Sequence, residues 1–201
     1  MADLQSPLYR LQDDTLARIF SHLSPVEVTA LGAVSRRVRR VASFPEVLHY
    51  TSFHFTHHPQ LFVKFLRTAT ASAIVDLDLN NCIQMDAVNT AECLRSCVNL
   101  TALRCINTKI LPGALLALTA NELSKLTCLE WSLYSEHRTH AQELLEQLKT
   151  GEVTFALERL QRMYIEVDSN KAIADLLVYV LQRCPYLESV QLYNDTRGQY
   201  Q

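Results

Sequence analysis

One spacing pattern recurs along most of this chain, and it constrains the fold more than any other feature of the sequence. Apolar residues stand at positions 1, 4 and 6 of a nine-residue segment, most clearly in IVDLDLNNC at 74–82. Six such segments begin at residues 50, 74, 100, 126, 160 and 187, at intervals of 24, 26, 26, 34 and 27 residues. A regular interval of this length is typical of proteins built from stacked repeats.

Each segment predicts a short strand with one buried face, because its apolar residues alternate. The stretches between the segments carry apolar residues at helical spacing, which predicts helices over 59–68, 85–97, 113–126, 141–149 and 172–183. One strand and one helix cannot bury both of their faces, so the units are expected to stack into a curved solenoid. The predicted fold class is therefore α/β, with about six strand–helix units.

The 34-residue interval contains an insertion, SEHRTHAQELLEQLKTGEV, which spans most of residues 135–156. Its helical pattern ends at Gly151, a residue type that commonly caps the C-terminus of a helix. We expect the insertion to lengthen the helix of one repeat or the loop beside it, although insertions in solenoids also serve as binding elements. No further repeat is recognisable after the segment at 187–195, so we expect the array to end without a capping unit.

The first 45 residues follow a different pattern and predict a small helical module. Residues 13–23 have a helical apolar face, and Asp13 and Asp14 place negative charge at the start of that helix. Ser24, Pro25 and Glu27 form a helix-start signal with a capping box. A module of this size rarely buries its own apolar faces fully, so these helices either contact a partner protein or cap the rest of the chain, and composition alone does not separate the two.

Residues 11–42, LQDDTLARIFSHLSPVEVTALGAVSRRVRRVA, resemble an F-box. The matching features are Leu11, the Leu16/Ile19/Phe20/Leu23 face, and Leu31 followed by Val34 and two basic residues. Gln12 replaces the usual proline and Val38 replaces the usual tryptophan. The resemblance implies that the module docks on the Skp adaptor of a cullin-based ubiquitin ligase through Leu8, Leu11, Leu16, Ile19, Phe20, Leu23, Val26, Leu31, Val34 and Val38.

The order of the two parts resembles F-box proteins with C-terminal leucine-rich repeats. This resemblance implies an F-box-like module at 1–45 and a repeat domain at 46–201 that holds a protein target for ubiquitination and degradation. On such a solenoid the residues between the inward positions project from the concave face. The candidate target-binding residues are Asp76, Asp78, Arg104, Glu130, Arg162, Tyr164, Glu166, Gln191 and Tyr193.

Several kinds of catalytic site are excluded by the residue pattern. The four glycines, at 32, 113, 151 and 198, are too far apart for a phosphate-binding loop or a dinucleotide-binding turn, and no G-x-S-x-G elbow is present. Cys93 and Cys97 stand four residues apart, yet no second pair completes a zinc site. The repeat phase predicts buried positions for Cys82, Cys97, Cys105 and Cys184. We therefore expect no metal, no cofactor and no enzymatic activity.

Two other functions remain open from the sequence. The substitutions at Gln12 and Val38 would suit an interaction scaffold that has lost adaptor binding. The Arg36, Arg37, Arg39 and Arg40 cluster would suit a helix-turn-helix on DNA, but a net charge of −2 gives no supporting basic field, so we expect no nucleic-acid partner. The N-terminal residues show no secretory signal and no apolar run reaches membrane-spanning length, which predicts a cytoplasmic or nuclear protein without membrane contact.

Overall fold

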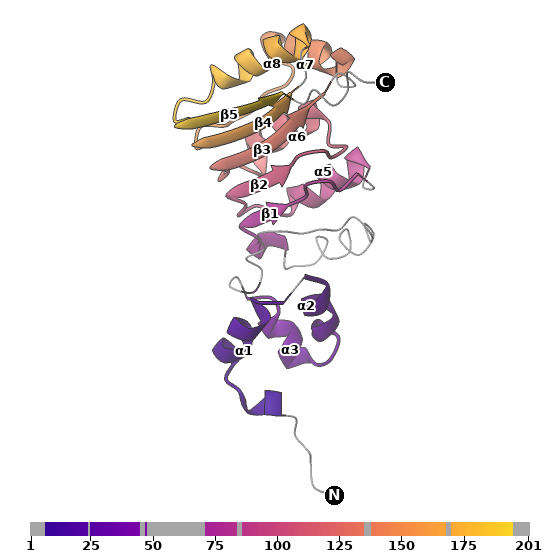
Figure 1. Ribbon diagram of the computed structural model, residues 1–201, viewed down its shortest axis with the longest axis vertical. Helices are drawn as coiled ribbons and strands as arrows, with labels where there is room; N and C mark the ends of the chain where they lie inside the picture. The colour runs from indigo at the N-terminus through magenta and orange to yellow at the C-terminus, as the bar shows by residue number, and fades with distance from the viewer. Residues whose placement is uncertain are drawn as a thin grey trace, which may run out of the picture.

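The computed structural model describes residues 7–23, 25–44, 47, 71–83, 86–134, 138–167 and 170–194. These residues form two hydrophobic clusters, one made by residues 11–47 and the other by residues 71–187. Figure 1 shows the corresponding parts as a small group of helices and as a row of five strands backed by helices. The predicted strand at 50–58 and the predicted helix at 59–68 lie outside the described residues.

The first cluster is a three-helix module. A short 3₁₀ helix, η1 (Pro7–Arg10), precedes α1 (Asp13–Phe20), α2 (Pro25–Gly32) and α3 (Arg36–Val41). The predicted break near Gly32 is confirmed, and α3 starts where the Ser35 hydroxyl accepts a hydrogen bond from the Val38 N–H at 3.2 Å. The capping box predicted at Ser24 and Glu27 lies partly outside the described residues.

The second cluster is a parallel α/β unit. The strands are β1 (Asp76–Asp78), β2 (Ala102–Cys105), β3 (Cys128–Leu133), β4 (Arg162–Val167) and β5 (Ser189–Asn194), and in the described residues they form one sheet in that order. The connecting helices are α5 (Ala87–Arg95), α6 (Pro112–Asn121), α7 (Arg138–Thr150) and α8 (Lys171–Leu181), and a short 3₁₀ helix, η2 (Ala71–Ala73), precedes β1. Successive helices pack on one another, behind the sheet in Figure 1.

The register of the sheet equals the spacing of the sequence pattern. Asp76 pairs with Ala102, Ala102 with Cys128, Cys128 with Arg162, and Arg162 with Ser189, which are steps of 26, 26, 34 and 27 residues. The backbone hydrogen bonds at the start of each strand also repeat from unit to unit. The carbonyl oxygens of Val75, Thr101, Thr127 and Gln161 each accept two backbone N–H groups from the next unit. The predicted α/β class is confirmed, and the predicted segments that begin at 74, 100, 126, 160 and 187 each contain one strand of a parallel sheet in the described residues.

Most of the residues predicted to face inward form the core, but Val190 and Leu192 of the last unit are exposed. The first apolar residue of each unit is almost fully buried in four units and half-buried in the last, at Leu187. Trp131, at the third apolar position of β3, is 1% exposed, and its indole N–H has no hydrogen-bond partner in the described part of the chain. The four cysteines predicted to be buried, Cys82, Cys97, Cys105 and Cys184, are at most 6% exposed.

The insertion is absorbed by α7 and the turn that follows it. At 13 residues α7 is the longest described helix, and Gly151 directly after it has a φ of +80°. The Val153 N–H then donates to the Gln147 carbonyl at 3.2 Å, a C-terminal capping bond that satisfies one of the last carbonyls of the helix. The predicted helix end at Gly151 is confirmed.

Candidate functional site

The helical module combines a closed core with exposed apolar side chains. Leu16 and Phe20 of α1 are 1% and 3% exposed, whereas Ile19 of the same helix is 41% exposed and Val34 is 66% exposed. Val38, which replaces the tryptophan of the F-box pattern, is 9% exposed and packs in the core. The remaining predicted docking residues with described side chains, Leu11, Leu23 and Leu31, are half-buried against the same core. The side chains of Leu8 and Val26 lie outside the described part of the structure.

Three of the four arginines of α3 contact α1, α2 or the residue before α1, whereas Arg36 is exposed. Arg37 Nε donates to Asp13 Oδ1 at 2.8 Å, a second guanidinium nitrogen of Arg37 donates to the Leu11 carbonyl, and Arg40 pairs with the other oxygen of Asp13. Arg39 Nε donates to the Gly32 carbonyl at 2.9 Å. The hydrogen bonds from Arg37 and Arg40 hold the pKa of the Asp13 carboxyl below its usual value. These contacts give the charge cluster a role in joining the three helices.

The second candidate surface is the polar face of the sheet. Parallel pairing brings Asp78, Arg104, Glu130, Tyr164 and Gln191 into one row across the five strands. Paired residues of neighbouring strands project from the same face. The predicted residues Asp76 and Arg162 lie in the row before, and Glu166 pairs with Tyr193 in the row after. The structure therefore brings all nine predicted target-binding residues to one face.

Over β1–β3 this face is held by ion pairs. The Arg104 guanidinium lies between two carboxylates: it pairs with Asp76 and donates from Nε to Glu130 Oε1 at 3.1 Å. These contacts raise the pKa of Arg104 against the effect of its partial burial. Asp78 is only 9% exposed, and its Oδ1 accepts the Asn80 N–H at 2.9 Å. This half of the face therefore has most of its charges engaged within the molecule.

Over β4 and β5 the same face is more open. Arg162 and Gln191 are exposed, Tyr193 is 47% exposed, and Tyr164 is half-buried beside them. Burial and the nearby Glu166 carboxylate raise the pKa of Tyr164. Its hydroxyl can donate a hydrogen bond to a partner, as any tyrosine hydroxyl does at neutral pH. Glu166 itself accepts a hydrogen bond of 2.6 Å from the Tyr134 hydroxyl.

An asparagine ladder at the end of the strands was not foreseen as a structural element. Asn81 and Asn107 occupy the same position in two successive units, and both have positive φ values, 63° and 52°. The Asn107 side-chain N–H donates to the side-chain oxygen of Asn81 at 2.9 Å. The identical residue at an interval of 26 positions was the signal that could have revealed it, because asparagine tolerates the left-handed conformation better than most residues.

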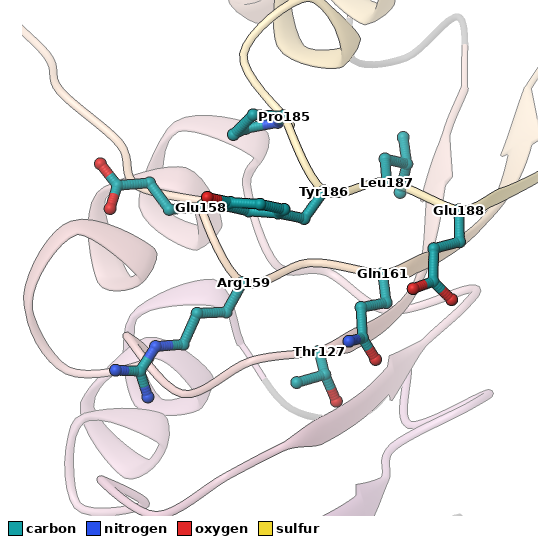
Figure 2. Close-up of a pocket in the computed structure, with 8 residues that line it drawn as sticks. All are labelled: Thr127, Glu158, Arg159, Gln161, Pro185, Tyr186, Leu187 and Glu188. Atoms are coloured by element: carbon teal, nitrogen blue, oxygen red, sulfur yellow. The ribbon is translucent and has the colours of Figure 1, made fainter.

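Two hollows lie away from this face. One, of about 520 Å³, lies where the chain enters β4 and β5, and Figure 2 shows Tyr186 extending toward Glu158 on one side of it, with Gln161 and Glu188 on the other. The second, of about 610 Å³, lies between α7 and α8. None of the predicted target-binding residues lines either hollow. Within the part of the chain that the structure describes, no group of three or more His, Cys, Asp or Glu side chains is placed to hold a metal ion.

Comparison with known proteins identifies the helical module. Residues 8–50 match the F-box domain, so the chain carries an F-box domain that includes all three helices of the module. F-box domains generally bind the Skp adaptor within cullin-based ubiquitin ligases, and the domain indicates an adaptor role in such a ligase. A search of curated proteins returned no match to the chain. Among the described helices, none is both long and apolar enough to cross a membrane.

Proposed function

We propose that this chain is a substrate-recognition adaptor of a Skp–cullin–F-box ubiquitin ligase. The F-box domain would dock on the Skp adaptor, and the parallel sheet, as part of a leucine-rich-repeat solenoid at 46–201, would hold a protein target. The observation that carries the proposal is the combination of an F-box match at residues 8–50 with two large apolar side chains that this small module leaves exposed.

Ile19 and Val34 are the best candidates for direct adaptor contact. They are 41% and 66% exposed, so a partner that covers them gains roughly 1–2 kcal/mol from each. That corresponds to about a tenfold change in affinity per residue. Leu16, Phe20 and Val38 support the docking surface from within, since all three are buried.

The open half of the sheet face, over β4 and β5, supports target binding. Tyr164 and Tyr193 project from this face together with Arg162 and Gln191, and tyrosine and arginine are enriched among residues that dominate binding energy. In the β1–β3 half, Arg104 is already neutralised by two carboxylates. We therefore expect the target to contact the tyrosine-rich half and to present polar side chains that pair with Arg162 and Gln191.

The mechanism of such an adaptor is proximity. The chain would carry out no covalent chemistry itself; it would hold the target near a separate catalytic enzyme and so raise the effective concentration of the two reactants. A cytoplasmic or nuclear location would suit this role.

Adaptor docking is tested by co-purification of Skp and cullin with the tagged full chain. Ile19→Asp combined with Val34→Asp should abolish recovery of both proteins, whereas Val98→Asp, which charges a valine that is 43% exposed on the repeat unit, should not. All three side chains are at least 41% exposed, so an aspartate at each position can reach solvent and circular dichroism should show both variants folded. If the wild-type protein recovers its target proteins but neither Skp nor cullin, the result would favour an interaction scaffold outside a ligase.

Target binding is tested separately, by affinity purification from cells with the proteasome inhibited. Tyr164→Ala combined with Tyr193→Ala should release the target while Skp stays bound, and Glu152→Ala, at an exposed site after α7, serves as the control. Retention of the same targets by the double-tyrosine variant would contradict the assignment of this face.

A further inference from the structure

The last strand of the sheet leaves core positions uncovered. Val190 and Leu192 of β5 pair with Met163 and Ile165 of β4 and point to the same side of the sheet. Met163 and Ile165 are 2% and 0% exposed, but Val190 and Leu192 are 40% and 58% exposed. In the described residues β5 pairs only with β4, and Figure 1 shows β5 at the end of the row of strands.

The helix of the same unit has an uncovered flank as well. On α8 the Tyr179 side faces α7, since the Tyr179 hydroxyl donates to the Leu148 carbonyl at 2.8 Å. Helical spacing places Ala174, Val178 and Leu181 on the other flank. Ala174 is exposed, Val178 is 53% exposed and Leu181 is half-buried. We call these three residues, together with Val190 and Leu192, the terminal face.

Within Ser189–Asn194 the β5 edge lacks two of the features that usually prevent edge pairing. The sequence of the strand, SVQLYN, contains neither a charged residue nor a proline. An exposed six-residue edge of this composition is a template for another strand. A partner that brings a helix as well as a strand would also cover the apolar flank of α8. An extended peptide would pair with the strand and leave the helix uncovered.

We propose that the terminal face is a homodimer interface in which β5 pairs antiparallel with β5 of a second copy. A two-fold axis through Gln191 sets Val190 opposite Leu192 of the other copy on the core side, and sets Gln191 opposite itself. No like charges meet across the strands, because the strand is uncharged. The same axis brings the two α8 helices to the same side of the joined sheet, which continues through both copies.

Such a dimer would present two F-box domains and two tyrosine-rich faces in one assembly. The interface consists of one strand edge and one helix flank, which is small for a specific interface, so we expect dissociation in the range of about 1–100 μM. This inference does not depend on adaptor binding, and it is tested with the chain alone.

The test is sedimentation equilibrium of the full 201-residue chain over that concentration range. The mass should rise from 22.9 kDa toward twice that value. Val190→Lys with Leu192→Lys should keep the protein monomeric, because it sets lysine opposite lysine. Val190→Lys with Leu192→Glu should restore association, because each lysine then faces a glutamate of the other copy.

The two double variants are matched, since both replace the same exposed side chains with long charged ones and should fold equally well. Val88→Lys, at a valine that is 68% exposed on α5, should leave the wild-type association unchanged. A wild-type protein that stays monomeric throughout the range, or Lys/Lys and Lys/Glu variants that associate equally, would overturn the proposal.

Discussion

Two leucines at the same repeat position should differ greatly in their contribution to stability. Leu79 and Leu192 both occupy the third apolar position of their units, but Leu79 is 0% exposed and Leu192 is 58% exposed. Replacing a fully buried leucine with alanine costs about 2–5 kcal/mol, because apolar contact is lost and a cavity is left. Leu192 buries less than half of its surface, so Leu192→Ala should cost about 1 kcal/mol or less.

Urea unfolding measures both losses. Trp131 is the one tryptophan of the chain and is 1% exposed, so its fluorescence reports the core of the sheet, and circular dichroism reports the helices. The experiment should be run well below 1 μM, a concentration at which the proposed dimer is dissociated. If Leu79→Ala and Leu192→Ala lower the free energy of unfolding by equal amounts, the conclusion that Leu79 is buried and Leu192 is largely exposed is wrong.

Three further predictions concern thiols, charge and backbone. Cys128 is half-buried and the other five cysteines are buried. Burial raises the pKa of Cys97 to about 12 and also raises the pKa of Cys128, so a thiol reagent at pH 8 should modify one cysteine slowly in the native protein, lost in Cys128→Ser, and six after unfolding. The hydrogen bond from Arg37 lowers the pKa of Asp13 in the folded state. The ionised Asp13 therefore stabilises the fold above about pH 3.8, and this stabilisation is lost in more acidic solution. The free energies of unfolding of Asp13→Asn and the wild type should differ at pH 7 and become equal in acid. Gly151→Ala should cost about 1 kcal/mol in thermal unfolding because φ is +80°. Gly113→Ala, at the second residue of α6, should change the stability by less than about 1 kcal/mol, because the gain in helix propensity is offset by a contact of 3.4 Å between the new Cβ and Leu144.

The repeat pattern was sufficient to predict the arrangement of the sheet. The apolar positions determine which side of each strand is buried, and because the spacing between segments is also the register between strands, the row Asp78, Arg104, Glu130, Tyr164, Gln191 follows from the sequence. The helix bounds were less accurate, since the predicted helix at 113–126 runs from Pro112 to Asn121. Leucines after α6 continue the apolar pattern although the chain has already turned toward β3.

The contacts of charged residues could not be predicted from the pattern. Arg104 is 26 residues from Glu130 and 28 from Asp76, and only the side-chain conformations decide that it pairs with both. The pairing of Arg37 and Arg40 with Asp13 depends on how α3 crosses α1. The same limit applies to the F-box residues, because helical spacing predicted an apolar face but did not separate the buried Phe20 from the exposed Ile19.

The most direct test of the adaptor role is a calorimetric titration of purified Skp adaptor into the purified 201-residue chain. We expect saturable binding with one Skp adaptor per chain, about 100-fold weaker for Ile19→Asp combined with Val34→Asp and unchanged for Val98→Asp. No detectable binding by the folded wild-type chain, or equal affinities for the wild type and the Ile19/Val34 variant, would contradict the account.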